Sequence, residues 1–298
     1  MGFKTESEIR SAMDIEKAFS DIAEDIRKEN YDDACRKTVD LASSSEDVNV
    51  KLKCASLLKV IECEDECQDI VDSVLDSVSE DDVLRFDIGL SVRALGRAED
   101  AYELMKDYRD DRPKVPEIAR TLMIIGESED ALELMTERGC DTIEESILFC
   151  NILCSVGEYT KALAEAEKIV KEDGETPETL HNLAAVLLRK GDVKAAVKLA
   201  KEHLDKKNAD SLALQAYVMY MSGKIPAAVN YANRALHVDY SNISALETMA
   251  MCLIEKGETK KAKLFAGVIN NKDPLNPAAM RILDACRITS SIGKKASS

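Results

Sequence analysis

The residues best suited to chemistry in this chain are its nine cysteines and three histidines. Cys63 and Cys67 bracket three acidic residues, and Cys150 and Cys154 lie one helical turn apart. Thiolates and carboxylates together bind zinc or a similar divalent metal, so a metal site at Cys63 and Cys67 is one interpretation. The other is that these cysteines pack as small apolar side chains of helices. We favour packing and predict no metal.

The histidines form no recognisable active-site motif. His181, His203 and His237 lie far apart, and none belongs to an HExxH sequence. The chain also lacks a GxSxG nucleophile motif, a phosphate-binding P-loop and a GxGxxG dinucleotide motif. We therefore expect no catalytic residue and no cofactor, and we predict that the protein is not an enzyme.

The composition excludes several classes of protein. With 12 Gly and 6 Pro in 298 residues, the chain is too poor in turn formers for collagen, low-complexity disorder or an all-β fold. Its formal charge of −16 argues against binding to nucleic-acid phosphates. The charged N-terminal segment lacks a signal peptide's apolar core, and the longest apolar run, residues 147–156, is too short for a bilayer. We expect a cytoplasmic protein with reduced thiols and no membrane contact.

A repeated sequence pattern runs along the chain and determines where its cysteines and histidines lie. Gly followed five residues later by Ala occurs six times, from Gly96–Ala101 to Gly257–Ala262. Upstream, Glu29–Ala34 and Glu62–Cys67 continue the same spacing, although Glu replaces Gly in both and Cys replaces Ala in the second. Successive repeats are 30 to 34 residues apart, which indicates a repeat architecture. The anchor residues of the eight repeats are Ala34, Cys67, Ala101, Ala131, Ala162, Ala196, Ala228 and Ala262.

Each repeat is predicted to form two amphipathic helices joined by a glycine turn. In the sixth repeat Leu180, Leu183, Ala184 and Leu187 lie on one helical face, and Gly191 then ends the helix. The residue twelve positions before the anchor is small in seven of the eight repeats, which lets the two helix axes approach closely.

Three helix starts are also predicted from capping residues. Thr142–Glu145 has the sequence of a capping box. Thr176 and Asn276 each stand directly before a proline, the arrangement of an N-cap followed by Pro at the first helical position.

The recurring residues and their spacing resemble those of the tetratricopeptide repeat (TPR), a helix–turn–helix unit of about 34 residues. The likeness covers residues 143–276 best, extends to 81–141 and is weakest in 1–80; Pro274 matches the family's proline between units. The resemblance implies an all-α, right-handed α-solenoid of about eight repeats. We divide it into acidic divergent repeats (1–142), four TPR-like repeats (143–276), a capping helix (277–290) and a flexible tail (291–298).

The resemblance also implies a concave groove lined by the first helix of each repeat. In the seventh repeat Leu212, Gln215, Ala216 and Met219 form the packing stripe, and a second stripe starts at Ala213. Second-stripe residues would contact a bound peptide or helix, and Tyr and Met suit such a surface. The predicted groove residues are Asn151, His181, Arg189, Tyr217, Tyr220, Met221 and Met251.

The charge is divided unevenly along the chain. Residues 1–150 hold 39 acidic and 19 basic residues, and residues 151–298 hold 17 acidic and 21 basic ones. We therefore weigh two modes of protein binding: a scaffold that holds a protein or peptide in the groove, and an electrostatic module whose acidic half engages a basic protein. We expect a monomer or weak self-association, and no nucleic acid.

Overall fold

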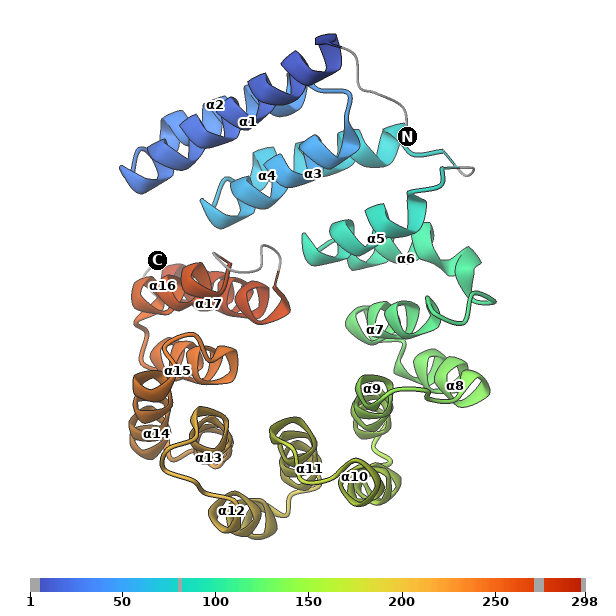
Figure 1. Ribbon diagram of the computed structural model, residues 1–298, viewed down its shortest axis with the longest axis vertical. Helices are drawn as coiled ribbons and strands as arrows, with labels where there is room; N and C mark the ends of the chain where they lie inside the picture. Colours follow the sequence, from blue (N-terminus) through green and yellow to red (C-terminus); the bar gives the residue numbers. More distant parts are fainter. Residues whose placement is uncertain (1–5, 80–81, 271–275, 296–298) are drawn as a thin grey trace. The chain divides into compact units, whose positions relative to one another are not determined.

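The computed structural model describes residues 6–79, 82–270 and 276–295, with side chains from residue 13 to residue 289 of these ranges. Within them the chain forms seventeen α-helices and one short 3-10 helix, and no strand (Figure 1). The predicted all-α class is confirmed, whereas the right-handed sense of the solenoid and the number of repeats remain predictions. Among the described helices, none combines the length and apolarity that a bilayer crossing requires.

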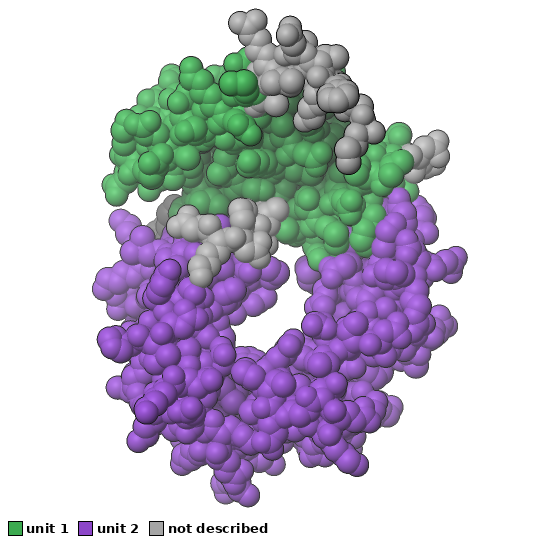
Figure 2. All heavy atoms as spheres, viewed as in Figure 1, with its two compact units in different colours: residues 1–97 green, residues 98–298 purple. Residues whose placement is uncertain are grey.

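The helices belong to two compact units, residues 1–97 and 98–298, coloured green and purple in Figure 2. The division predicted at residue 142 stays a prediction. Unit 1 holds α1 (Glu6–Arg27), α2 (Tyr31–Ser44), α3 (Val48–Val60), α4 (Glu64–Ser77) and α5 (Arg85–Ala94). Unit 2 holds α6 (Ala98–Met105), the 3-10 helix (Lys106–Tyr108), α7 (Val115–Ile125), α8 (Ser128–Arg138), α9 (Ile143–Ser155), α10 (Tyr159–Asp173), α11 (Pro177–Arg189), α12 (Val193–Glu202), α13 (Ala209–Met221), α14 (Ile225–Val238), α15 (Ile243–Glu255), α16 (Thr259–Asn270) and α17 (Pro277–Lys295).

The anchor residues mark the same place in every repeat. Each is the fourth residue of an even-numbered helix, from Ala34 in α2 to Ala262 in α16, and each is fully buried. Consecutive helices pack against each other as antiparallel hairpins within a unit, for example α3 with α4 and α13 with α14. A buried methyl or thiol at the contact lets the two backbones approach closely, so the anchor column sets the hairpin geometry.

The turn inside each repeat needs a left-handed residue. All six repeat glycines have positive φ, between 72° and 97°. The same slot in the first two repeats holds Glu29 (φ 59°) and Glu62 (φ 67°), the only non-glycine residues with positive φ among those described. The phase predicted from the sequence is therefore confirmed even where glycine is missing.

In unit 2 the first and second helices of the repeats form two rows. α9, α11, α13 and α15 lie side by side in an inner row, with α10, α12 and α14 outside them (Figure 1). Each inner helix is thirteen residues long and begins after a side-chain N-cap: Thr142, Thr176, Asn208 or Asn242. Because caps and lengths match, equivalent positions of the four helices fall into register along the inner row.

α17 packs against α15 and α16; its role as the capping helix of a solenoid end stays a prediction. Ala279, Ile282 and Cys286 share a core cluster with Ala262 and Ala266 of α16. Asn276 caps the helix by accepting the Ala278 N–H at 3.0 Å. The helix continues to Lys295, into the segment expected to be a tail; residues 296–298 and the predicted inter-repeat Pro274 lie outside the described residues.

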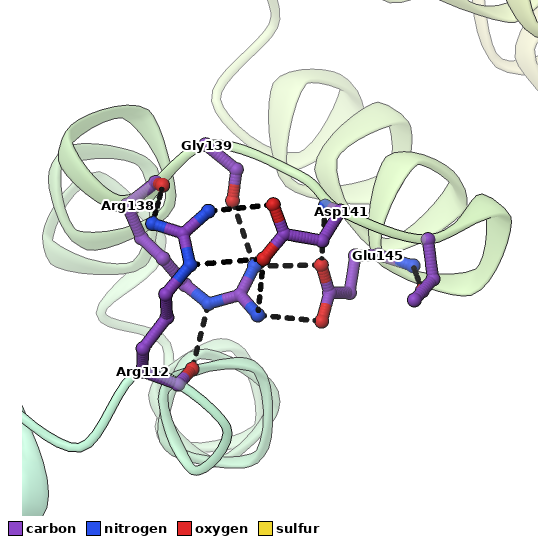
Figure 3. Close-up of polar contacts among 6 residues, drawn as sticks. Arg112, Arg138, Gly139, Asp141 and Glu145 are labelled. Atoms are coloured by element: carbon purple, nitrogen blue, oxygen red, sulfur yellow. Dashed lines mark hydrogen bonds and ion pairs between the residues drawn. The ribbon is translucent and has the colours of Figure 1, made fainter.

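A buried ionic joint fixes α9 to the preceding repeat (Figure 3). The Arg138 guanidinium, 6% exposed, donates two hydrogen bonds of 2.6 Å to the Glu145 carboxylate. It also donates to the backbone oxygens of Arg112 (2.7 Å) and Gly139 (2.8 Å). Arg112 in turn bonds Asp141 through both ends of its guanidinium, at 2.6 and 2.9 Å. The joint ties the loop before α7, the end of α8 and the start of α9 together.

This joint corrects one detail of the predicted capping box. Thr142 does cap α9 by accepting the Glu145 N–H at 3.2 Å. The Glu145 side chain, however, is engaged by Arg138 and by the Asp141 N–H at 2.7 Å. A carboxylate gains more from a buried guanidinium than from a single amide, so the reciprocal half of the box is replaced.

Candidate functional site

The candidate site is the inner row formed by α9, α11, α13 and α15. Numbering each of these thirteen-residue helices from its first residue, the predicted groove residues fall mainly on two positions. Asn151, Tyr217 and Met251 occupy position 9, and Arg189 and Met221 occupy position 13. The remaining two are His181 at position 5 of α11 and Tyr220 at position 12 of α13.

Two contacts join these residues across neighbouring helices. Arg189 Nη1 on α11 donates a 3.0 Å hydrogen bond to Asn151 Oδ1 on α9. On the next boundary the His181 ring stacks on the Tyr217 ring, with centroids 4.3 Å apart and planes inclined by 29°. The structure thus brings four of the seven predicted residues into two pairs.

The row ends in an ion pair that the sequence did not reveal. Glu247, at position 5 of α15, accepts two hydrogen bonds from Arg281 of α17, at 2.7 and 3.0 Å. Arg281 was missed because it lies outside the repeats, where the period assigns no equivalent position. The sequence offered one indication of this ion pair: a basic residue, Arg281, follows the repeats, and an acidic residue, Glu247, lies one repeat earlier.

Burial keeps the aromatic pair uncharged. Desolvation lowers the pKa of His181, opposed by the Glu247 carboxylate. Desolvation also raises the pKa of Tyr217, with the Arg189 charge acting in the opposite direction. Both rings are therefore neutral at pH 7, with the Arg189 cation and the Glu247 anion nearby.

Exposure varies along the predicted second stripe of α13. Met221 is 47% exposed, and Tyr217 and Tyr220 are half-buried. Ala213, which we predicted to start this stripe, is instead buried in a cluster with Ala235 and Ala245. That part of the prediction was wrong because α14 and α15 pack against α13 at Ala213.

Both tyrosines also support the core. One side of each ring packs against the apolar cluster between α11 and α13, which includes Leu187 and Val218. Burial raises the pKa of Tyr220, and the nearby Glu255 carboxylate raises it further. Tyr217 and Tyr220 therefore contribute to the core and also leave part of their side chains accessible on the inner row.

The cysteines divide into packing residues and one mixed cluster. Cys150 and Cys154 are buried, and Cys150 Sγ donates a 3.7 Å contact to the Ala162 oxygen, as expected for packing residues. Cys67 fills its anchor slot, also as expected. Cys63 differs, because its thiol lies next to Cys35 and Glu66.

No protein-family model and no curated protein sequence matches the chain. Among solved structures, a tetratricopeptide repeat protein from Parabacteroides merdae is 11% identical with a TM-score of 0.47, covering 80% of this chain and 98% of its own. The Cut9–Hcn1 hetero-tetramer of the APC/C is 16% identical with a TM-score of 0.41, and 86% of this chain spans 52% of that chain. YrrB, a TPR protein with an unusual peptide-binding site, is 14% identical with a TM-score of 0.32, covering 71% of this chain and 96% of its own.

These likenesses concern the fold, and they carry no argument about what this chain binds. The chain spans about half of the Cut9 structure's chain. The chain's own repeats consist of paired helices 30 to 34 residues apart, with a left-handed turn and a buried small anchor in each.

Proposed function

We propose that this TPR-type repeat protein is a non-enzymatic scaffold that binds a segment of another protein along the inner row of unit 2. The observation that supports the proposal is the register of α9, α11, α13 and α15. The four helices have equal lengths and equivalent N-caps, which align their positions 9 and 13. The contacts of Arg189 with Asn151 and of His181 with Tyr217 join neighbouring helices into one surface.

The chemistry of this surface suits a peptide or short helix with an apolar anchor and a hydrogen-bond acceptor. Tyr217, Tyr220 and Met221 offer ring and thioether area next to a hydroxyl, which costs little side-chain entropy to order. Arg189 is exposed, and its guanidinium has more N–H donors than the Asn151 oxygen can accept. A backbone or side-chain oxygen of the partner would bind there.

We expect the affinity to be micromolar, about −8 kcal/mol, because ordering a flexible segment offsets much of the contact energy. Exchange of a partner is then rapid, as suits an adaptor. The cytoplasmic location and the monomeric or weakly associating state remain predictions.

The test is recovery of partners from the native cell by the full-length protein. Tyr217→Ala combined with Tyr220→Ala should reduce recovery at least tenfold, since each removes most of an aromatic contact. Tyr159→Ala, on the outer helix α10 where Tyr159 is 38% exposed, is the matched control and should leave recovery unchanged.

Because both tyrosines also touch the core, far-UV circular dichroism and Met221→Ala accompany the double variant. Met221→Ala truncates a side chain that is 47% exposed and belongs to none of the core clusters described above, so it should weaken recovery several-fold while the protein stays folded. Unchanged recovery by the double variant would refute the groove. Steep salt dependence together with insensitivity to all groove substitutions would instead indicate the electrostatic mode.

A further inference from the structure

Three metal-binding side chains lie close together in unit 1. They are Cys35 on α2, and Cys63 and Glu66 at the start of α4. The two thiol sulfurs and a carboxylate oxygen all lie within 4.8 Å of one another, and all three residues are half-buried. The cluster differs from the Cys63 and Cys67 pair that we weighed and set aside on sequence grounds, because Cys67 is buried in the hairpin core.

The repeat architecture explains why these residues meet. Cys63 is the N-cap of α4 and Glu66 is its third residue, so both side chains emerge from the same turn. Cys35 directly follows the buried anchor Ala34, and α2 packs against α4 of the next repeat.

We propose that Cys35, Cys63 and Glu66 bind one Zn²⁺ ion, with a water molecule as the fourth ligand. Two thiolates select a borderline metal such as zinc over Mg²⁺ or Ca²⁺, and one carboxylate completes a common zinc donor set. The site is independent of the groove, because all its ligands belong to unit 1.

The separations fit tetrahedral coordination after a small adjustment. Zinc–thiolate bonds of about 2.3 Å at tetrahedral angles place two sulfurs roughly 3.8 Å apart. Donor atoms within 4.8 Å reach that separation by shifts of about 1 Å, which side-chain rotation provides.

Such an ion would join the first two hairpins. Its ligands come from α2 and α4, the second helices of successive repeats, so it would link one hairpin to the next. These are the two repeats in which Glu occupies the left-handed turn. Metal binding would thus stabilise the part of the array whose repeats depart furthest from the glycine pattern.

Cobalt titration of the reduced, full-length protein tests the proposal. The wild type should bind one equivalent of Co²⁺ with the visible bands of tetrahedral cobalt and a sulfur-to-metal charge-transfer band, and Zn²⁺ should displace it. Cys35→Ser, Cys63→Ser and Glu66→Gln should each weaken binding at least tenfold. Cys67→Ala is the matched control, because alanine fills the other seven anchor slots, and it should retain the full spectrum.

Cadmium-113 NMR of the wild type keeps the test decisive even if a variant misfolds, because the chemical shift reports the number of thiolate ligands. A shift typical of two thiolates supports the site. No tetrahedral cobalt spectrum in the wild type, a full spectrum in folded Cys35→Ser, or loss of the spectrum in folded Cys67→Ala would overturn it. A Cys35–Cys63 disulfide that persists under reducing conditions would overturn it as well.

Discussion

Replacing Glu29 by glycine should stabilise the first hairpin, because Glu29 holds a backbone conformation that glycine adopts without strain. Its φ is 59°, its side chain is exposed, and the equivalent slot holds glycine in six later repeats. The left-handed conformation costs a non-glycine residue about 1–2 kcal/mol. Glycine loses about 0.5–1 kcal/mol more backbone entropy on folding. The expected net gain is about 0.5–1 kcal/mol.

Hydrogen exchange measured by mass spectrometry resolves this gain hairpin by hairpin. If the hairpin opens locally, amides of α1 and α2 should exchange about two to five times more slowly in Glu29→Gly than in the wild type. Glu29→Ala is the matched control, because it removes the charge near the C-terminus of α1 but keeps the Cβ. That variant should gain only a few tenths of a kcal/mol, from the helix dipole.

The converse substitution probes the same strain in unit 2. Gly191 has φ 90°, and a Cβ built there meets nothing within 4 Å. Gly191→Ala should therefore cost about 1 kcal/mol through backbone conformation alone. The reasoning is refuted if Glu29→Gly protects no better than Glu29→Ala, or if Gly191→Ala is as stable as the wild type.

Three further outcomes are expected. Arg138→Met should lower the free energy of unfolding of unit 2 by about 2–3 kcal/mol in urea at pH 7, because it leaves the Glu145 carboxylate buried without its guanidinium. Arg112→Ala, at the exposed edge of the joint, should lower it much less. Equal losses in the two variants would contradict this expectation. Arg138 lowers the pKa of Glu145, so the stabilisation is present above the unfolded carboxyl pKa of about 4.3 and is lost as the pH falls through the folded pKa. The difference in the free energy of unfolding between wild type and Arg138→Met should therefore shrink below about pH 4. Burial raises the pKa values of Cys54 and Cys150 to about 11, so both should resist alkylation at pH 8 in the native protein, and rapid labelling by a thiol reagent would contradict their placement.

Much of the fold could be predicted because its determinants recur locally. The left-handed turn and the buried anchor lie five residues apart in every repeat, so one phase predicted Glu29 and Ala34 as well as Gly257 and Ala262. The division between Arg97 and Ala98 could not be predicted, because it falls inside the third repeat, between Gly96 and the anchor Ala101, where the sequence pattern continues unbroken.

The candidate site was predictable to the level of helix faces. Periodicity placed Asn151 and Tyr217 at equivalent positions, but it could not show that Arg189 bonds Asn151, 38 residues earlier. It misplaced Ala213, because one of the two helices that pack against it, α15, belongs to the next repeat. Cys35 was missed for the same reason, since its partner Cys63 lies in the following repeat.

The fixed distance between turn and anchor also determines where the chain can change its length during evolution. One residue inserted between Gly191 and Ala196 would rotate the anchor by about 100° around its helix and remove it from the hairpin contact. The second helices, by contrast, range from 8 residues in α6 to 15 in α10. Insertions and deletions among related chains should therefore gather between each anchor and the following N-cap, where they alter the spacing of repeats and leave the hairpins themselves intact.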